Sequence, residues 1–279
     1  ASPFRLISLG HCSYQPMAEV YYLRAQFSLD REPFLRVSHG DIFEIHGRNK
    51  GDGSLAARNI FTGEAGLLPR PSEFVYVEVT AAHLGYTQPV LLVGSLSSHI
   101  QDLLLSRRPA EFGTPVPHTT RPKRLNERHG HEYWFVKRET MEKMLKGDLF
   151  VECGRLGEFL YGTSEAAIRN VAQREKKHCL LDSSTSIPHL LSRSLHPMVL
   201  FVGALSWRQL QDVTSFDGGS EYQAREWMAK DEQILEQMKM YFTGVVRERS
   251  LEDSYQQVLG FIDRKGSWIP QTGHPDRLI

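Results

Sequence analysis

The chain has only three cysteines in 279 residues, and its 33 lysines and arginines balance its 33 aspartates and glutamates. Cys12, Cys153 and Cys179 are odd in number and far apart, which gives no disulfide framework and favours a reducing compartment. Zero net charge argues against a nucleic-acid partner, because phosphate neutralisation requires clustered, uncompensated cations. The longest apolar run, around 197–205, falls short of the ~20 residues of a membrane-spanning helix. We therefore expect a soluble protein without direct membrane insertion.

Two regions of the chain differ in pattern. From 18 to 80, short runs of β-branched and aromatic residues alternate with glycine-containing turns, which is typical of a small all-β barrel. From 88 to 265, apolar strand-like runs alternate with helical periodicity, which is typical of an α/β domain with a parallel sheet. Residues 1–17 form an N-terminal extension. Because the chain begins at Ala1 without a secretory signal pattern, we expect a piece of a longer polypeptide.

Local signals predict helix ends in the second region. Ser164 is expected to cap one helix, and Gly147 to end the helix that precedes it. Ser97 or Ser98 is expected to cap the helix that follows the first apolar strand. A long helix is predicted over 222–240.

The segment 115–136 carries a local surplus of positive charge within this neutral chain. Its cations between 121 and 128 are Arg121, Lys123, Arg124 and Arg128, against Glu127 alone. Guanidinium groups suit bidentate contact with phosphate oxygens, and a tyrosine hydroxyl adds a directional donor. The pattern favours a phosphate ligand, and a solvated surface loop is the alternative interpretation of the same charges.

The order of motifs around this segment resembles the nucleoside-monophosphate-binding region of guanylate kinase. The matching motifs are Thr119–Arg121, Arg124, Glu127, Gly130, Tyr133–Val136, Glu152 and Leu160–Ser164. In that family two arginines and two tyrosines hold the GMP phosphate, and acidic side chains recognise the guanine edge. The resemblance covers nearly the whole second region and implies an α/β P-loop-kinase-like fold, a parallel sheet with flanking helices.

The resemblance also implies a set of ligand-binding residues. They are Arg121, Arg124, Glu127, Tyr133, Glu152, Tyr161, Gly162 and Thr163. The arginines and tyrosines would hold a phosphate, with Thr163 as an additional hydroxyl donor. Glu152 would recognise the base, and Glu127 would support the arginine loop.

The loop expected to hold ATP departs from the family pattern. An active kinase needs G-x-x-x-x-G-K-[ST], whose backbone N–H groups and lysine hold the phosphates. The equivalent loop here begins at Gly94, but His99 replaces the second glycine, Ile100 the lysine and Gln101 the magnesium-binding hydroxyl. Losing these groups removes most of the electrostatic stabilisation of phosphoryl transfer, so we expect an inactive domain without cofactor or metal.

Two further departures concern GMP. Pro117 replaces a serine at the hinge of the binding lobe and stiffens it, and Ser184 follows Asp182 where a second guanine-reading carboxylate is expected. Proline at this hinge is typical of the membrane-associated guanylate kinase scaffold family, and 116–124 is most similar to its discs-large branch. In that family the former GMP site binds peptides carrying phosphoserine or phosphothreonine.

The first region resembles the SH3 domain that precedes the kinase-like domain in these scaffolds. The similar stretches are 21–27, the turn Gly40–Asp41 and Gly66–Pro69. Ser54–Ala57 stands where an ordinary SH3 domain has a tryptophan pair, so we do not expect binding of proline-rich motifs. The stretch 266–271 resembles the family's final strand, which would pair with 74–79 and complete the barrel.

The resemblance implies a phosphorylated protein partner and PDZ domains upstream in the full-length protein. It also implies packing between the two domains and a cytoplasmic location at the inner face of the plasma membrane, at a cell junction, the cell cortex or a synapse. Three alternatives remain open: a residual guanylate kinase, a GMP sensor without turnover, and a module whose role is intramolecular assembly.

Smaller signals are interpreted as structural. His129, His131 and Cys153 lack the spacing of a zinc site. Cys153 and Cys179 are expected to be core thiols. The stripe of Trp227, Ile234 and Met238 is expected to face the core.

Overall fold

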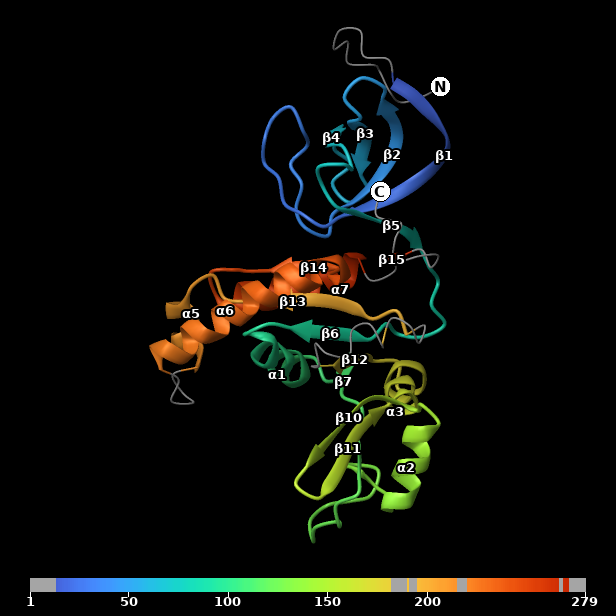
Figure 1. Cartoon of the computed structure of the whole chain (residues 1–279), viewed down its shortest axis with the longest axis vertical. Helices are drawn as coiled ribbons and strands as arrows, with labels where there is room; N and C mark the ends of the chain where they lie inside the picture. The colour runs from blue at the N-terminus through green and yellow to red at the C-terminus, as the bar shows by residue number, and fades with distance from the viewer. Residues whose placement is uncertain (1–13, 182–189, 191–194, 215–219, 266–267, 271–279) are drawn as a thin grey trace. The chain divides into compact units, whose positions relative to one another are not determined.

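The computed structural model describes residues 14–181, 190, 195–214, 220–265 and 268–270 (Figure 1). The chain divides into two compact units, which are described separately. Unit 1 takes in residues 1–82 and 268–279, and unit 2 takes in 83–267. Unit 1 is therefore built from both ends of the chain.

Unit 1 is a six-stranded antiparallel sheet in the order β15-β5-β1-β2-β3-β4, an SH3-like barrel. Its strands are β1 (Tyr14–Ala25), β2 (Ile42–Asn49), β3 (Leu55–Asn59), β4 (Ala65–Leu68), β5 (Tyr76–Ala81) and β15 (Trp268–Pro270). β1 begins at Tyr14, inside the segment predicted as an N-terminal extension, because residues 14–16 pair with the far end of β2.

Alternating residues of these strands form the core of unit 1. Leu23 and Phe43 are fully buried, and the Tyr76 hydroxyl donates a hydrogen bond of 2.8 Å to the Pro69 carbonyl oxygen. Burial raises the pKa of Tyr76. Leu55 and Ala57 also lie in this core, so β3 presents small aliphatic side chains where the sequence lacks the tryptophan pair.

The prediction that a C-terminal strand completes the barrel is confirmed for 268–270, but its partner is 79–81, and only Val79 of this segment lies in the predicted 74–79. Trp268 pairs with Ala81, and Pro270 pairs with Val79. The Trp268 ring also packs on Tyr22 of β1, with ring centroids 4.8 Å apart. The remaining predicted positions, 266–267 and 271, lie outside the described residues.

Unit 2 is built on a parallel sheet in the order β14-β13-β6-β12-β7. Its strands are β6 (Val90–Val93), β7 (Phe112–Gly113), β12 (His178–Leu181), β13 (Met198–Val202) and β14 (Gly244–Val246). The helices are α1 (Ser97–Arg107), α2 (Arg138–Lys146), α3 (Glu165–Arg169), α5 (Trp207–Thr214), α6 (Glu221–Met238) and α7 (Leu251–Lys265). One π-helical turn (Asn170–Arg174) and one 3-10 turn (Lys239–Tyr241) follow α3 and α6.

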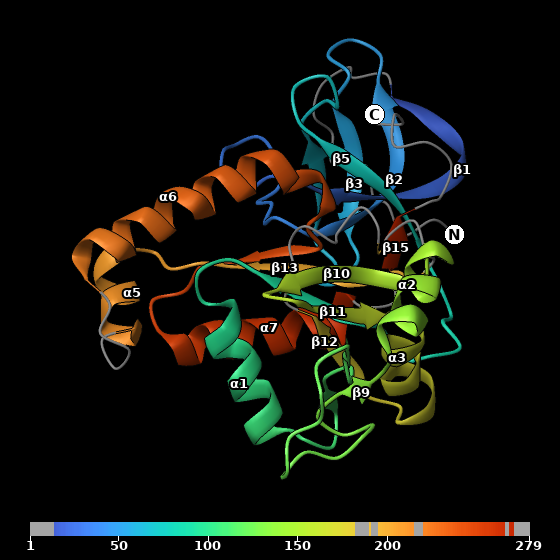
Figure 2. The same ribbon diagram turned by 60° about the horizontal axis from the view of Figure 1, so that its bottom comes forward.

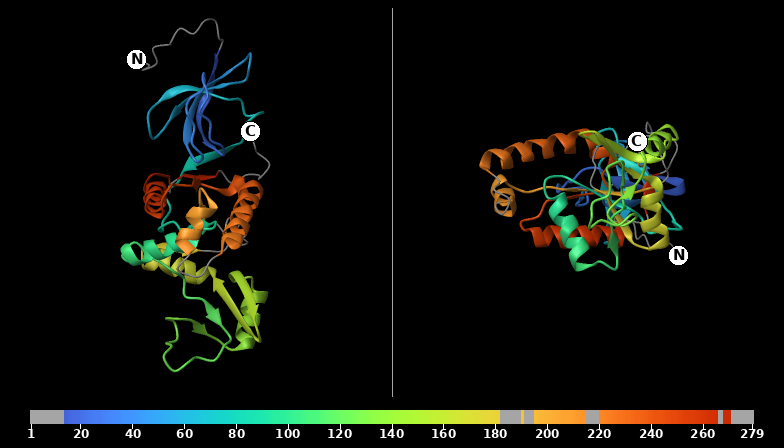
Figure 3. Two further views of the ribbon diagram at one scale, coloured as in Figure 1. Left: turned by 90° about the vertical axis from the view of Figure 1, so that its left-hand side faces the viewer. Right: turned by 90° about the horizontal axis from the view of Figure 1, so that it is seen from below.

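Both faces of this sheet are buried, which explains why its strands are apolar throughout. Val90 and Leu92 pack in one cluster with residues of α1 and α7, and Leu91 and Val93 pack in a second cluster with residues of α3 and α6. Figure 3 accordingly shows α7 and α6 on opposite sides of the central strands. The fold class predicted from the sequence is confirmed.

A smaller sheet in the order β10-β11-β8-β9 projects from the central one at the bottom of Figure 1 and comes to the front in Figure 2. Its strands are β8 (His118–Thr119), β9 (Trp134–Phe135), β10 (Phe150–Leu156) and β11 (Phe159–Ser164). β8 and β9 are parallel, whereas β11 is antiparallel to both β8 and β10. Its strands β10 and β11 hold four of the eight predicted ligand-binding residues: Glu152, Tyr161, Gly162 and Thr163.

Two of the three predicted helix ends are confirmed. The Ser164 hydroxyl accepts the Ala167 N–H at 3.2 Å, and Gly147 is the C-terminal cap of α2. The prediction for α1 was wrong: Leu96 is its N-cap, without a side-chain hydrogen bond. The loop after β6 is so short that Ser97 is already helical. The capping box of α6, formed by Ser220 and Gln223, was not predicted.

The structure also corrects two predictions about side chains. Cys179 is buried, but Cys153 is exposed because β10 leaves the core after Val151. Trp227 is 38% exposed, so of the three residues in the predicted stripe only Ile234 and Met238 pack against the core. No helix among the described residues is long and apolar enough to cross a membrane, and those residues contain no group of three potential metal ligands.

Candidate functional site

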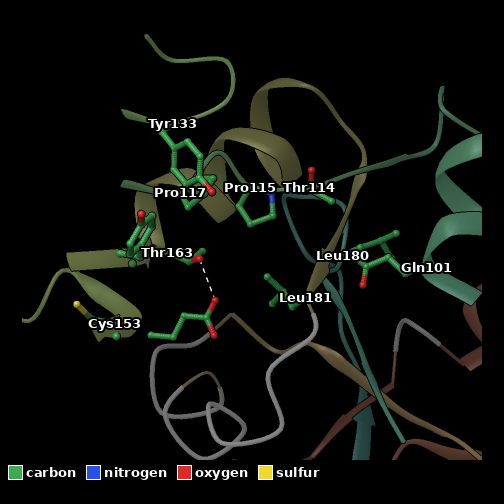
Figure 4. Close-up of a pocket in the computed structure, with 13 residues that line it drawn as sticks. Gln101, Thr114, Pro115, Pro117, Tyr133, Cys153, Thr163, Leu180 and Leu181 are labelled. Carbon is green, nitrogen blue, oxygen red and sulfur yellow. Dashed lines mark hydrogen bonds between the residues drawn. The ribbon is translucent and has the colours of Figure 1, made fainter. Parts of the chain in front are cut away.

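A cavity of about 550 Å³ lies in unit 2, between the small sheet and the central sheet (Figure 4). Its lining combines hydroxyl and carboxylate groups with proline and leucine side chains. The residues are Gln101, Thr114, Pro115, Pro117, Tyr133, Glu152, Cys153, Gly154, Tyr161, Gly162, Thr163, Leu180 and Leu181. Gln101, from α1, faces the small sheet across the cavity. The structure therefore brings six of the predicted site positions to one cavity: Pro117, Tyr133, Glu152, Tyr161, Gly162 and Thr163, with Gln101 opposite.

Arg121 and Glu127 form a bidentate ion pair at the edge of this region. Arg121 Nη1 lies 3.0 Å from Glu127 Oε2, and Nη2 lies 2.6 Å from Oε1. The backbone N–H of Arg124 donates to the same carboxylate at 2.7 Å and closes the turn. The two side chains are only 12% and 15% exposed, so the pair is well shielded from water. Glu127 thus holds the arginine loop in place.

Aromatic rings fix the Arg121 guanidinium from another direction. Its central carbon lies 5.4 Å from the Tyr133 ring centroid and 5.6 Å from that of Phe135. Tyr133 in turn meets Tyr161 edge to face, with centroids 5.9 Å apart. Glu127 raises the pKa of Arg121, and the Tyr161 hydroxyl adds a smaller contribution, so that hydroxyl also lies close to the guanidinium.

Thr163 and Glu152 interact inside the cavity. They are direct partners in the β10–β11 ladder, and the Thr163 hydroxyl donates to Glu152 Oε1 at 2.9 Å (Figure 4). A Cβ on neighbouring Gly162 would lie 2.9 Å from the Glu152 carbonyl oxygen and from the Phe150 ring, so this position requires glycine. The antiparallel register therefore presents a carboxylate and a hydroxyl side by side.

Arg121, Arg124 and Glu127 are not among the cavity-lining residues, although the sequence grouped them with the tyrosines. The Arg121 guanidinium lies over the ring of Tyr133, and Tyr133 itself lines the cavity. Arg124 is exposed, and its guanidinium makes no hydrogen bond or ion pair with the described part of the chain. The two arginines therefore differ: Arg121 is paired with Glu127 through two hydrogen bonds, whereas the Arg124 side chain acts on Glu127 only through its charge.

The loop predicted to have lost ATP contacts lies between β6 and α1. Gly94 has a φ of +115°, and a Cβ there would lie 2.5 Å from the Val202 carbonyl oxygen. Ile100, which the sequence comparison predicted at the position of the kinase lysine, is fully buried in the core. His99 is half-buried and Gln101 lines the cavity, so neither position carries a lysine or an arginine.

Several site features were not predicted from the sequence, or cannot be placed. Phe135 was not assigned its contact with Arg121; its position two residues from Tyr133 on a strand was the available signal. The exposed Cys153 lines the cavity, against expectation. Asp182 and Ser184 lie outside the described residues.

The ion pair leads to a pH prediction. The Arg121 guanidinium, helped by the Arg124 N–H, lowers the pKa of Glu127 from 4.5 to about 2. Because the folded-state pKa is lowered, the contribution of the pair to stability is complete above about pH 4.5 and is lost as the pH falls towards 2. An NMR titration of the Glu127 carboxyl group should give a midpoint near 2; a midpoint near 4.5 would show that the pair does not form in solution.

A family model described as guanylate kinase matches residues 86–265, more than half of the chain. The chain therefore belongs to the guanylate kinase family, as the motifs of the small sheet predicted.

The similar curated proteins narrow the comparison to the disks large homologues. Disks large homolog 3 of Mus musculus is 36% identical over 208 residues, covering 73% of this chain and 24% of that protein. Disks large homolog 2 of Homo sapiens is 38% identical over 200 residues, covering 70% and 23%. Together with the SH3-like unit, these matches make the chain an SH3–guanylate kinase tandem of the membrane-associated guanylate kinase type. It spans about a quarter of the length of these relatives.

Among solved structures, the SH3-kinase fragment of tight junction protein 3 matches 91% of this chain and 100% of its own, with 16% sequence identity and a TM-score of 0.45.

Proposed function

We propose that this chain is a non-catalytic scaffold module whose α/β unit binds phosphoserine or phosphothreonine segments of partner proteins. The observation that carries the proposal is the fixed position of Arg121, held by Glu127 and by two aromatic rings beside the cavity. A guanidinium that is already ordered loses little entropy when a phosphate binds.

Each residue has a role in this proposal. Arg124 supplies the uncompensated positive charge for the phosphate, and Arg121 supplies oriented donors. The hydroxyl groups of Tyr133 and Tyr161 add hydrogen bonds to the phosphate oxygens. Thr163 is an additional hydroxyl donor next to Glu152.

The walls of the cavity favour a peptide over a nucleotide. Pro115, Pro117, Leu180 and Leu181 offer apolar contacts for side chains that flank the phosphorylated residue. Pro117 also fixes the backbone φ at the junction between the small sheet and the central sheet, which limits closure over a small ligand. The buried Ile100 supports the absence of catalysis, because a lysine is needed there to hold ATP phosphates.

The second candidate is a GMP sensor without turnover. Glu152 and Thr163 favour it, since their hydrogen-bonded pair could recognise the edge of a guanine. Calorimetry with GMP separates the candidates: we expect no heat of binding at concentrations that saturate the phosphopeptide site. Saturable GMP binding would favour the sensor.

The test of the main proposal compares two peptide libraries that are identical except that the central serine is phosphorylated in one. We expect retention of the phosphorylated library alone, and release by inorganic phosphate or by phosphatase treatment. Equal retention of both libraries would contradict the proposal. A coupled assay for ADP with GMP, ATP and magnesium should stay at background, and clear turnover would identify a residual guanylate kinase.

The wider setting follows from the family and is also proposed. The full-length protein would carry PDZ domains upstream of this chain. It would act in the cytoplasm at the inner face of the plasma membrane, at a cell junction, the cell cortex or a synapse. Packing between units 1 and 2 would make the tandem one functional module.

A further inference from the structure

Three consecutive backbone N–H groups where the loop after β6 enters α1 have acceptors within the protein. The N–H of Ser95 donates to Asp231 Oδ1 at 2.9 Å, and the N–H of Leu96 donates to the Val202 carbonyl oxygen at 3.1 Å. The N–H of Ser97 donates to the Gly94 carbonyl oxygen at 3.1 Å. A phosphate-binding loop needs such consecutive N–H groups to point at its ligand. Here three in a row have protein acceptors.

Asp231 supplies an internal anion to this loop. It lies on α6 and is 2% exposed. Its Oδ2 accepts the Ser95 hydroxyl at 2.5 Å, while that hydroxyl oxygen accepts the Ala204 N–H at 3.4 Å. A buried carboxylate is costly unless it is hydrogen-bonded, and both oxygens of Asp231 have a donor from Ser95.

Two further features allow the carboxylate to sit there. A Cβ on Gly203 would lie 2.9 Å from Asp231 Oδ2, so only glycine leaves room for the side chain. Burial raises the pKa of Asp231, and the two hydrogen bonds from Ser95, followed by the positive charge of Arg247, oppose this rise. Arg247 Nη2 also donates to Glu232 Oε1 at 2.7 Å, and Glu232 lies next to Asp231 on α6. These residues join α6 to the ends of three central strands.

We propose that Asp231 is a built-in latch that replaces a bound phosphate: it holds the former ATP loop in a closed conformation without nucleotide and prevents nucleoside triphosphates from binding there. The latch also anchors the start of α1, which positions Gln101 in the cavity wall. This inference does not depend on the phosphopeptide proposal, because it concerns the opposite wall of the cavity.

Hydrogen exchange measured by mass spectrometry on the 279-residue chain tests the latch. In Asp231→Ala, we expect the amides of 95–100 to exchange about tenfold faster, since Ser95 loses its acceptor. Ser95→Ala should give a smaller increase, about threefold, because the backbone hydrogen bond remains. The double variant should exchange no faster than Asp231→Ala. Glu226→Ala, an exposed acid on the same helix, is the matched control and should leave these amides unchanged.

Millimolar ATP with magnesium provides the second measurement. In the wild-type chain it should not slow exchange in 94–101, because the loop donors are occupied. Protection of that segment by ATP would overturn the proposal. So would unchanged exchange in Asp231→Ala, or additive effects in the double variant. If Asp231→Ala does not fold, Ser95→Ala and the wild-type ATP titration still decide the question.

Discussion

Replacing Arg121 with alanine is expected to lower the affinity for a phosphopeptide about 100-fold, with little effect on the unphosphorylated peptide. Two effects add in this variant. The phosphate loses its oriented guanidinium donors, and Glu127 loses the partner that neutralises it, which leaves an uncompensated carboxylate beside the incoming phosphate. Fluorescence anisotropy with matched phosphorylated and unphosphorylated peptides measures both affinities.

Arg124→Ala should have a different signature. Its side chain is exposed and unpaired, so we expect a loss of about tenfold that shrinks at high salt. Arg128→Ala is the matched control, since Arg128 is also an exposed arginine of this loop and its backbone N–H, which donates to Glu132, remains in the variant. Arg121→Lys should recover little affinity, because an ammonium group cannot make the bidentate pair with Glu127.

Three results would contradict these roles. An unchanged affinity in Arg121→Ala would remove the residue from the site. An equal loss for both peptides would show a structural effect rather than phosphate binding. A loss in Arg128→Ala as large as that in Arg124→Ala would mean that the loop acts only through its general charge.

Deleting the chain from Trp268 onward is expected to lower the free energy of unfolding of unit 1 by about 3 kcal/mol. The deletion removes a three-residue strand from the edge of β5 and the Trp268 ring that packs on Tyr22. It also exposes the β5 edge, which has no other neighbour on that side of the sheet order. Amide exchange in β1 and β5 reports on unit 1 separately from unit 2, which suits a chain with two units.

The control for this deletion ends the chain after Pro270 and so keeps β15. It should exchange like the full chain in β1 and β5. Trp268→Phe tests the ring contact alone and should recover most of the protection. Equal exchange in the two truncated chains would show that β15 does not stabilise the barrel.

Much of the fold could be predicted because its signals are local or repetitive. The apolar strands of the central sheet are buried on both faces, so Leu91 and Leu92 are equally apolar although they face different clusters. Ser164 and Gly147 marked helix ends because capping depends on neighbouring backbone groups. The prediction that Ser97 caps α1 was wrong because a serine can cap a helix only when it lies just before the first helical residue, and Ser97 is itself helical.

The site was predictable only in part. The order of its motifs predicted Tyr133, Tyr161 and Thr163 as one group, and the structure places all three in the lining of the cavity. It could not show that Arg121 is neutralised by Glu127 while Arg124 is free, since both arginines look alike in a charged loop. Cys153 was misplaced because alternation along β10 does not reveal where the strand leaves the core.

The sequence by itself determined the class of fold and the balance of charge that argues against a polyanion partner, and it placed Ile100 where the resemblance predicts an ATP-binding lysine. Only the tertiary structure showed that Asp231 of α6 accepts hydrogen bonds from Ser95, in the loop that precedes Ile100. The two residues it connects, Ser95 and Asp231, are 136 positions apart. No local pattern distinguishes a buried acid on an amphipathic helix from a solvated one, because burial is set by what packs against the helix. Arg121 and Arg124 differ for the same reason. The sequence shows that both carry a positive charge, and only packing decides that Arg121 is paired with Glu127.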